Sequence, residues 1–157
     1  MLTEIQKKAA QAIVNIFETG SVPGKYDSVV SVAGDPGGLT YGAKQTTLNS
    51  GNLHLLIKAY TEAEGALFAD ELQPYLGRLK NKVQTLNRDS TLHGILRQAG
   101  RDSVMVQEQD AFFDRVYWTP ALNSAAAIKI QTALGVAVVF DSTIHGSWGL
   151  MRRDNSF

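Results

Sequence analysis

The chain has 157 residues, which is enough for one well-formed core and short for two ordinary domains, so its length predicts a single domain over residues 1–157. Its 15 lysine and arginine residues balance 15 aspartate and glutamate residues without a basic run, which excludes nucleic acid as an expected partner. The absence of cysteine excludes thiol catalysis, disulfides and cysteine-ligated zinc.

The first segment, residues 2–20, is predicted to be an amphipathic helix. Thr3 and Gln6 have the spacing of a capping box, and Gly20 stands where such a helix ends. The charged start is unlike a signal peptide, and no window approaches about 18 uninterrupted apolar residues. We therefore expect no membrane insertion, and export by a route that the sequence does not reveal.

The glycine-rich segment "GDPGGLTYG", residues 34–42, separates two predicted strands. Residues 26–33 are rich in β-branched side chains, and residues 43–47 are predicted to form a returning strand. Together they predict a small hairpin or sheet.

The rest of the chain is predicted to be helical. Asn49 or Ser50 is the expected cap of the first of these helices, and Thr119 with Pro120 is expected to open another. The predicted helices cover residues 49–65, 72–86, 91–100, 103–118, 119–135 and 136–146, and the second of them is expected to be interrupted or to start near Pro74. This order predicts a mainly α protein of the α+β class, in which a small β lobe faces a larger helical lobe across a cleft.

A glutamate at a helix end followed by an aspartate in a loop, here Glu18 and Asp35, could supply the two carboxyl groups of glycosidic-bond hydrolysis. That reaction uses an acid on one side of the bond and a base or nucleophile on the other. Glu18 lies in the last turn of the first helix, where the helix dipole should raise its pKa toward that of a general acid. Asp35 follows in the glycine segment. Taken singly, Glu18 is more simply a solvated side chain and Asp35 an Asx-turn that caps its own loop.

The neighbouring residues allow the same two interpretations. Thr40 could hold the attacking water or simply end a strand. The glycines could admit a polymer close to the backbone or form a mobile hairpin end. The tryptophans, Trp118 and Trp148, are favoured as core residues over sugar-stacking ones. The three histidines show no ligand spacing, so neither a metal nor another cofactor is expected.

Several motifs together resemble the family 46 glycoside hydrolases, the chitosanases of the lysozyme-like superfamily. They are "FETG", "GDPGGLTYG", "NSGNLHLLIKAY", "FFDRVYWTPAL" and "LGVAVVFDSTIHG", in the family's order. The resemblance implies a lysozyme-like fold, with Glu18 as general acid, Asp35 as general base, and inversion at the anomeric carbon. It also implies that Thr40 orients the water and that Asp114 and Arg115 belong to a supporting network.

Two departures from the family bear on the substrate. Gly37 replaces an arginine, and Asn52 replaces the aspartate that grips a free sugar amine. Because an amide cannot neutralise an ammonium group but can bond an N-acetyl group, Asn52 favours peptidoglycan over chitosan. With Asn52, the expected substrate-binding residues are Gly37, Gly38 and Tyr41.

The sequence therefore predicts an inverting, lysozyme-like muramidase that cleaves the β-1,4 bonds of peptidoglycan in the periplasm or outside the cell. A chitosanase and a non-catalytic wall-binding module are the alternatives. Because family members continue through further helices, the chain is either a compact variant or a module of a longer protein, such as an antibacterial toxin or phage lysin. An immunity or inhibitor protein would then be its partner.

Overall fold

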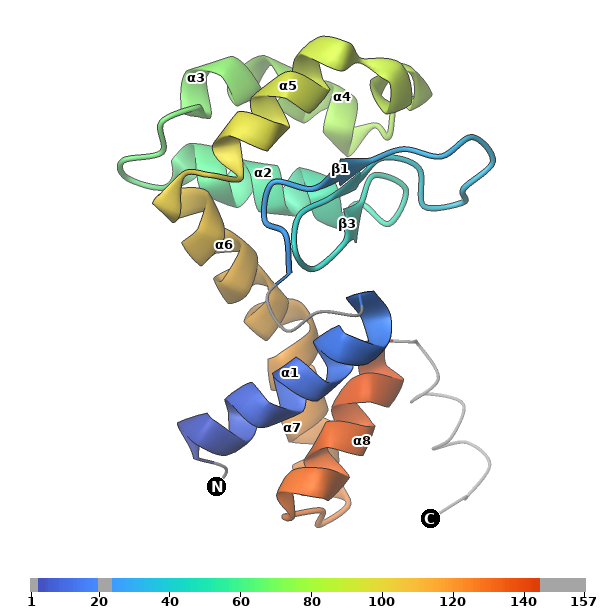
Figure 1. Cartoon of the computed structure of the whole chain (residues 1–157), viewed down its shortest axis with the longest axis vertical. Coiled ribbons are helices and arrows are strands. Elements are labelled where there is room, and N and C mark those ends of the chain that lie inside the picture. The colour runs from blue at the N-terminus through green and yellow to red at the C-terminus, as the bar shows by residue number, and fades with distance from the viewer. Residues whose placement is uncertain (1–2, 20–23, 145–157) are drawn as a thin grey trace. The chain divides into compact units, whose positions relative to one another are not determined.

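The computed structural model describes residues 3–19 and 24–144, and for residues 11 and 14–19 it describes the backbone alone. The described chain is mainly helical with one small sheet, which confirms the predicted α+β class (Figure 1). The α-helices are α1 (Glu4–Thr19), α2 (Asn52–Glu62), α3 (Ala69–Leu72), α4 (Leu76–Lys80), α5 (Ser90–Ala99), α6 (Ser103–Phe113), α7 (Thr119–Ala127) and α8 (Ala133–Ile144). The remaining elements are the strands β1 (Val29–Val30), β2 (Thr40–Tyr41) and β3 (Thr46–Thr47), the 3-10 helices η1 (Gln73–Tyr75) and η2 (Gln84–Arg88), and the π-helical turn η3 (Asp114–Trp118).

The chain divides into two compact units. The first, which we call the terminal unit, comprises residues 1–23 and 113–157, and the second, the central unit, comprises residues 24–112. A single domain over residues 1–157 stays a prediction.

The sheet of the central unit is antiparallel, with β2 between β1 and β3. Val29 lies opposite Tyr41, and Thr40 lies opposite Thr47. The strands are only two residues long, and β2 lies inside the glycine segment, where no strand was predicted. Gly42 ends β2 with a φ of +80°, and its N–H donates to the Ser28 carbonyl at 2.8 Å. Such left-handed positions interrupt extended backbone, so the predicted longer strands are wrong.

The helices of the central unit bury a stripe of leucines. Leu53, Leu56, Ile57 and Tyr60 of α2 are fully buried, as their spacing predicted, and α2 packs beside β3 (Figure 1). The predicted side-chain cap of this helix is wrong, because Gly51 occupies the N-cap position. The Ser50 hydroxyl nevertheless accepts a hydrogen bond from the Asn52 N–H at 3.1 Å.

The predicted helix over residues 72–86 is broken into α3, η1, α4 and η2. Pro74 lacks the N–H that would continue the helix, and Lys82 has a φ of +52°, which ends the second piece. Leu72, Leu79 and Leu86 are still fully buried, so the apolar spacing predicted the core correctly. The interruption near Pro74 is confirmed, whereas the break at Lys82 was not predicted.

In the terminal unit, α8 packs against α1 and α7 around an aromatic core. Phe140 makes edge contacts with Trp118 and Phe113, with ring centroids 4.9 and 5.6 Å apart. Trp118 is thus a core residue, as predicted, whereas Trp148 lies outside the described residues. The predicted cap at Thr119 is wrong, because the backbone is helical from η3 into α7 and the preceding turn supplies the acceptor carbonyls.

Candidate functional site

Asp35 is exposed on the loop between β1 and β2. Its Oδ1 accepts the Gly37 N–H at 2.8 Å, and its carbonyl accepts the Gly38 N–H at 3.1 Å. The Asx-turn considered for this residue is therefore present. It fixes one carboxylate oxygen to the loop while the side chain remains open to solvent, so both the structural and the chemical interpretation of Asp35 fit its geometry.

Thr40 lies on β2 and is half-buried. Its hydroxyl donates to the Gly38 carbonyl at 3.2 Å. A hydroxyl that uses its single proton in this way can still accept a hydrogen bond, for example from a water molecule. Asp35 and Thr40 are thus both bonded to Gly38, one through its N–H and the other through its carbonyl.

Tyr41 is the next residue on the same strand, and its side chain is fully buried. Its hydroxyl donates to the Leu96 carbonyl at 2.8 Å, and burial is the main cause that raises its pKa far above the ordinary value. The Tyr41 side chain therefore packs into the core, and the substrate-binding role predicted for this residue stays a prediction. The physical reason is the alternation of a β-strand: if Thr40 points outward, its neighbour must point into the core.

Asn52, the predicted specificity residue, is connected to the Asp35 loop through two hydroxyl groups. The Asn52 N–H donates to Ser50 Oγ, which also accepts a hydrogen bond from Thr47 Oγ1 at 2.9 Å. The methyl group of Thr47 lies beside Gly37, since a Cβ there would be 3.2 Å from Thr47 Cγ2. The backbone of half-buried Asn52 is thus linked through Ser50 to Thr47, which lies beside Gly37 of the Asp35 loop.

Gln109 of α6 anchors the backbone at the end of the glycine segment, and the sequence did not single it out. It is only 2% exposed, its Oε1 accepts the Ala43 N–H, and its Nε2 donates to the Tyr26 carbonyl, both at 2.9 Å. A Cβ on Gly42 would overlap this amide, so the packing requires glycine there. The sequence did carry a signal, because Gln109 follows buried Met105 by one helical turn and is thus a polar residue in an apolar stripe.

The other predicted residues belong to the terminal unit. Glu18 lies in the last turn of α1, but its side chain is outside the described residues. Asp114 and Arg115 lie on η3, and Asp114 forms an ion pair with Lys7 of α1. The supporting role predicted for Asp114 and Arg115 stays a prediction.

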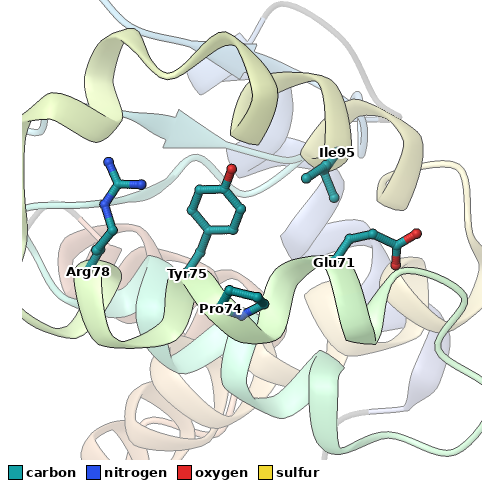
Figure 2. A pocket seen from close by; sticks show the side chains of 5 residues that line it. All are labelled: Glu71, Pro74, Tyr75, Arg78 and Ile95. Carbon is teal, nitrogen blue, oxygen red and sulfur yellow. The ribbon is translucent and has the colours of Figure 1, made fainter.

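A cavity of about 450 Å³ lies between the α3–α4 segment and α5 in the central unit. Figure 2 shows its five lining side chains, Glu71, Pro74, Tyr75, Arg78 and Ile95. Arg78 lies 5.6 Å from the centre of the Tyr75 ring and is paired with Asp89 at 3.2 Å. None of the predicted site residues lines this cavity, so the cavity lends them no support.

Within residues 3–19 and 24–144, no group of three His, Asp or Glu side chains could hold a metal ion, and no helix is long and apolar enough to cross a membrane. His93 bonds the Leu86 carbonyl at 3.0 Å. Burial, together with Lys80 and Lys58, lowers the pKa of His54. His145 lies outside the described part of the chain.

Comparison with known proteins places this geometry in context. The sequence profile of Glycosyl hydrolase family 46 matches residues 12–157. The chitosanase of Bacillus subtilis (strain 168) is 28% identical over 166 aligned positions, which cover 98% of this chain and 58% of that protein.

Solved structures give the same result. A family 46 chitosanase from Gynuella sunshinyii, in complex with chitotetraose, matches with a TM-score of 0.80 and 25% identity, over 94% of this chain and 61% of that one. The native chitosanase of Bacillus subtilis MY002 matches with a TM-score of 0.82 and 26% identity, over 99% of this chain and 68% of that one. These matches confirm the predicted fold, and the chain spans about three fifths of the length of the first two relatives.

Proposed function

Because this chain belongs to glycosyl hydrolase family 46, we propose that it hydrolyses the β-1,4 bonds of a glucosamine polymer of the chitosan type. The observation that carries the proposal is the exposed Asp35 carboxylate, held by its own loop within the region that the family profile matches. The relatives named above are chitosanases, and one was solved with chitotetraose. These comparisons favour chitosan over peptidoglycan, which the sequence alone had favoured.

In the proposed mechanism, Glu18 protonates the glycosidic oxygen as the bond to the anomeric carbon breaks. Asp35 removes a proton from a water molecule that attacks the anomeric carbon from the opposite face, which inverts its configuration. Thr40 accepts a hydrogen bond from that water and so orients it, as its geometry allows. In this proposal residues 1–157 act as one catalytic domain.

Peptidoglycan is the second candidate substrate, and Asn52 is the observation that favours it. This side chain is half-buried at the first position of α2 and carries an amide instead of a carboxylate. An amide can pair with an acetamido group but does not neutralise an ammonium group. Use as an antibacterial toxin, with an immunity protein as partner, stays a prediction.

The test is a parallel digestion of chitosan and purified peptidoglycan by the parent chain and by Glu18→Gln, with soluble products identified by mass spectrometry. We expect glucosamine oligomers from the parent and at least about a hundredfold slower release from Glu18→Gln. Asp70→Asn, an exposed carboxylate of α3, is the matched control and should be fully active.

Each other outcome of the digestion has a definite meaning. Muropeptides without chitosan oligomers would replace the proposal with the second candidate. Products from Glu18→Gln at the parent's rate would remove Glu18 from the mechanism. If the parent cleaves neither polymer but sediments with one of them, the chain is a binding module.

A further inference from the structure

Three side-chain amides close a hydrogen-bonded ring with the loop that carries Asp35. Asn87 Oδ1 accepts the Leu39 N–H at 2.7 Å, and Asn87 Nδ2 donates to Gln84 Oε1 at 3.0 Å. Gln84 Nε2 donates to Asn49 Oδ1 at 2.8 Å, and Asn49 Nδ2 donates to the Pro36 carbonyl at 2.7 Å. Residues 36–39 close the ring. We call these three side chains the amide ring.

The amide ring has one direction, because each amide accepts one hydrogen bond through its oxygen and donates the next through its nitrogen. Two bonds brace it from outside: Asn49 N–H donates to the Gly37 carbonyl at 3.0 Å, and Gln84 Nε2 also donates to the Lys82 carbonyl at 2.8 Å. A member that lost either function would leave its neighbour with one hydrogen bond fewer, so the three side chains should act as a unit.

Gly38 lies against two members of the amide ring. A Cβ at this position would be 3.0 Å from Asn87 Oδ1 and 3.3 Å from Asn49 Nδ2, and the φ of +69° disfavours any side chain there. The packing therefore accounts for this glycine without a polymer. The amide ring, in turn, packs against a backbone that is held in a single conformation at Gly38.

The amide ring reaches both groups of the proposed water-activating machinery. Asp35 is bonded to the N–H groups of Gly37 and Gly38, and Thr40 is bonded to the Gly38 carbonyl. We propose that Asn49, Gln84 and Asn87 are positioning residues that set the placement of Asp35 and Thr40 relative to each other. This rests on the proposed function, in which Asp35 is the base and Thr40 orients the water.

The burial of their surroundings predicts how strongly the loss of each of the three amides should affect the protein. Leu39 is fully buried, so without Asn87 its N–H would lose its partner away from water. Gln84 is exposed, and water can replace part of what its amide supplies. We expect Asn87→Ala to have the largest effect and Gln84→Ala the smallest.

The test measures kcat and KM on chitosan for Asn49→Ala, Asn87→Ala and the double variant. A displaced base and water should lower kcat about tenfold to a hundredfold while KM stays within about twofold. If the amides act as one ring, the double variant should be no slower than the slower single variant. Asn81→Ala is the matched control, because this exposed asparagine follows α4 in the same polar stretch and should be as active as the parent.

A second readout does not depend on activity. Exchange of the Leu39 amide proton, followed by NMR, should be faster in Asn49→Ala than in the parent, although Asn49 does not touch that N–H. Unchanged exchange of the Leu39 amide proton would contradict the inference that the three amides act as one unit. The same holds if the effects of the two single variants on kcat multiply in the double variant.

The remaining outcomes separate this inference from the proposed function. A parent that cleaves neither chitosan nor peptidoglycan overturns the proposed function and the positioning role with it. An active parent with unchanged kcat in a folded Asn87→Ala variant overturns the positioning role alone. If circular dichroism shows that Asn87→Ala is unfolded, Gln84→Ala takes its place, with a severalfold lower kcat expected and an unchanged kcat as the contradiction.

Discussion

The two units of the molecule hold their backbones by different means. The described part of the terminal unit consists mainly of regular helices, which satisfy their own N–H and carbonyl groups and pack through Trp118, Phe113 and Phe140. The central unit has short strands, short helices and turns, and several backbone groups of its turns are satisfied by buried or partly buried polar side chains, among them Asn87, Gln109 and Asp102. Irregular backbone can place a reactive loop, but it needs such partners to stay in place.

Asp102 illustrates how the central unit does this. It is 6% exposed and accepts hydrogen bonds from the Tyr60 hydroxyl at 2.6 Å and from the Leu67 and Val104 N–H groups at 3.0 Å. The Tyr60 hydroxyl in turn accepts the Phe68 N–H at 3.0 Å. One carboxylate therefore fixes the turn after α2 and the start of α6.

The largest effect is expected from Phe140→Ala, which tests whether apolar packing stabilises the terminal unit. Removing a fully buried aromatic ring from between Trp118 and Phe113 should lower the free energy of unfolding by about 3–5 kcal/mol. Urea denaturation measures this change. Val138→Ala, on the same helix but 48% exposed, should cost less than about 1 kcal/mol, and equal losses in the two variants would refute the packing account.

The polar side of the comparison is tested by Asp102→Ala in the central unit. Because three donors lose a charged acceptor, the free energy of unfolding should fall by about 3 kcal/mol. Urea denaturation measures this change as well. Asp70→Ala is the exposed control and should stay within about 0.5 kcal/mol of the parent. An Asp102→Ala variant as stable as the parent would show that the central unit does not depend on this carboxylate.

A smaller effect is expected on the pH dependence of stability. Burial by itself would raise the pKa of Asp102, but hydrogen bonds from Tyr60, Leu67 and Val104 outweigh it and lower the pKa below the ordinary 3.8. The unfolded chain then takes up a proton at higher pH than the folded chain does. This contribution to stability is therefore present above the ordinary pKa and is lost as the pH falls through the folded-state pKa.

Asp102→Asn checks this dependence, because it removes the titrating group while nearly preserving its shape. Unfolding free energies at pH 7 and pH 3 should differ less in Asp102→Asn than in the parent. An identical difference in both proteins would contradict the assignment of acid sensitivity to Asp102. Asp89 also has a lowered pKa, chiefly through the Leu92 N–H, so part of the dependence should remain.

The sequence predicted what depends on local spacing. Helical periodicity identified the buried face of α2, and the glycines marked the loop that carries Asp35. The alternation of a strand could also have separated Thr40 from Tyr41, since neighbours on a strand face opposite sides. These features follow from residues close together in the chain.

The sequence did not predict the amide ring, because the ring joins two segments that are far apart in the chain. Asn49 lies 35 residues from Gln84, and Asn87 lies 48 residues from its partner Leu39. Asparagine and glutamine in a polar stretch are equally typical of solvated loops, so only the folded chain distinguishes a structural amide from an exposed one. The short strands and the break at Lys82 were missed for another reason: they follow from left-handed backbone at Gly42 and Lys82, and residue type alone does not fix that conformation.

The most direct test of the central claim, that the central unit presents Asp35 as a catalytic base, is the initial rate of reducing-end release from chitosan by Asp35→Asn. Loss of a general base should lower that rate by about a hundredfold or more, while Asp70→Asn matches the parent. A folded Asp35→Asn variant that cleaves chitosan as fast as the parent would contradict the claim and leave Asp35 as the cap of its own loop.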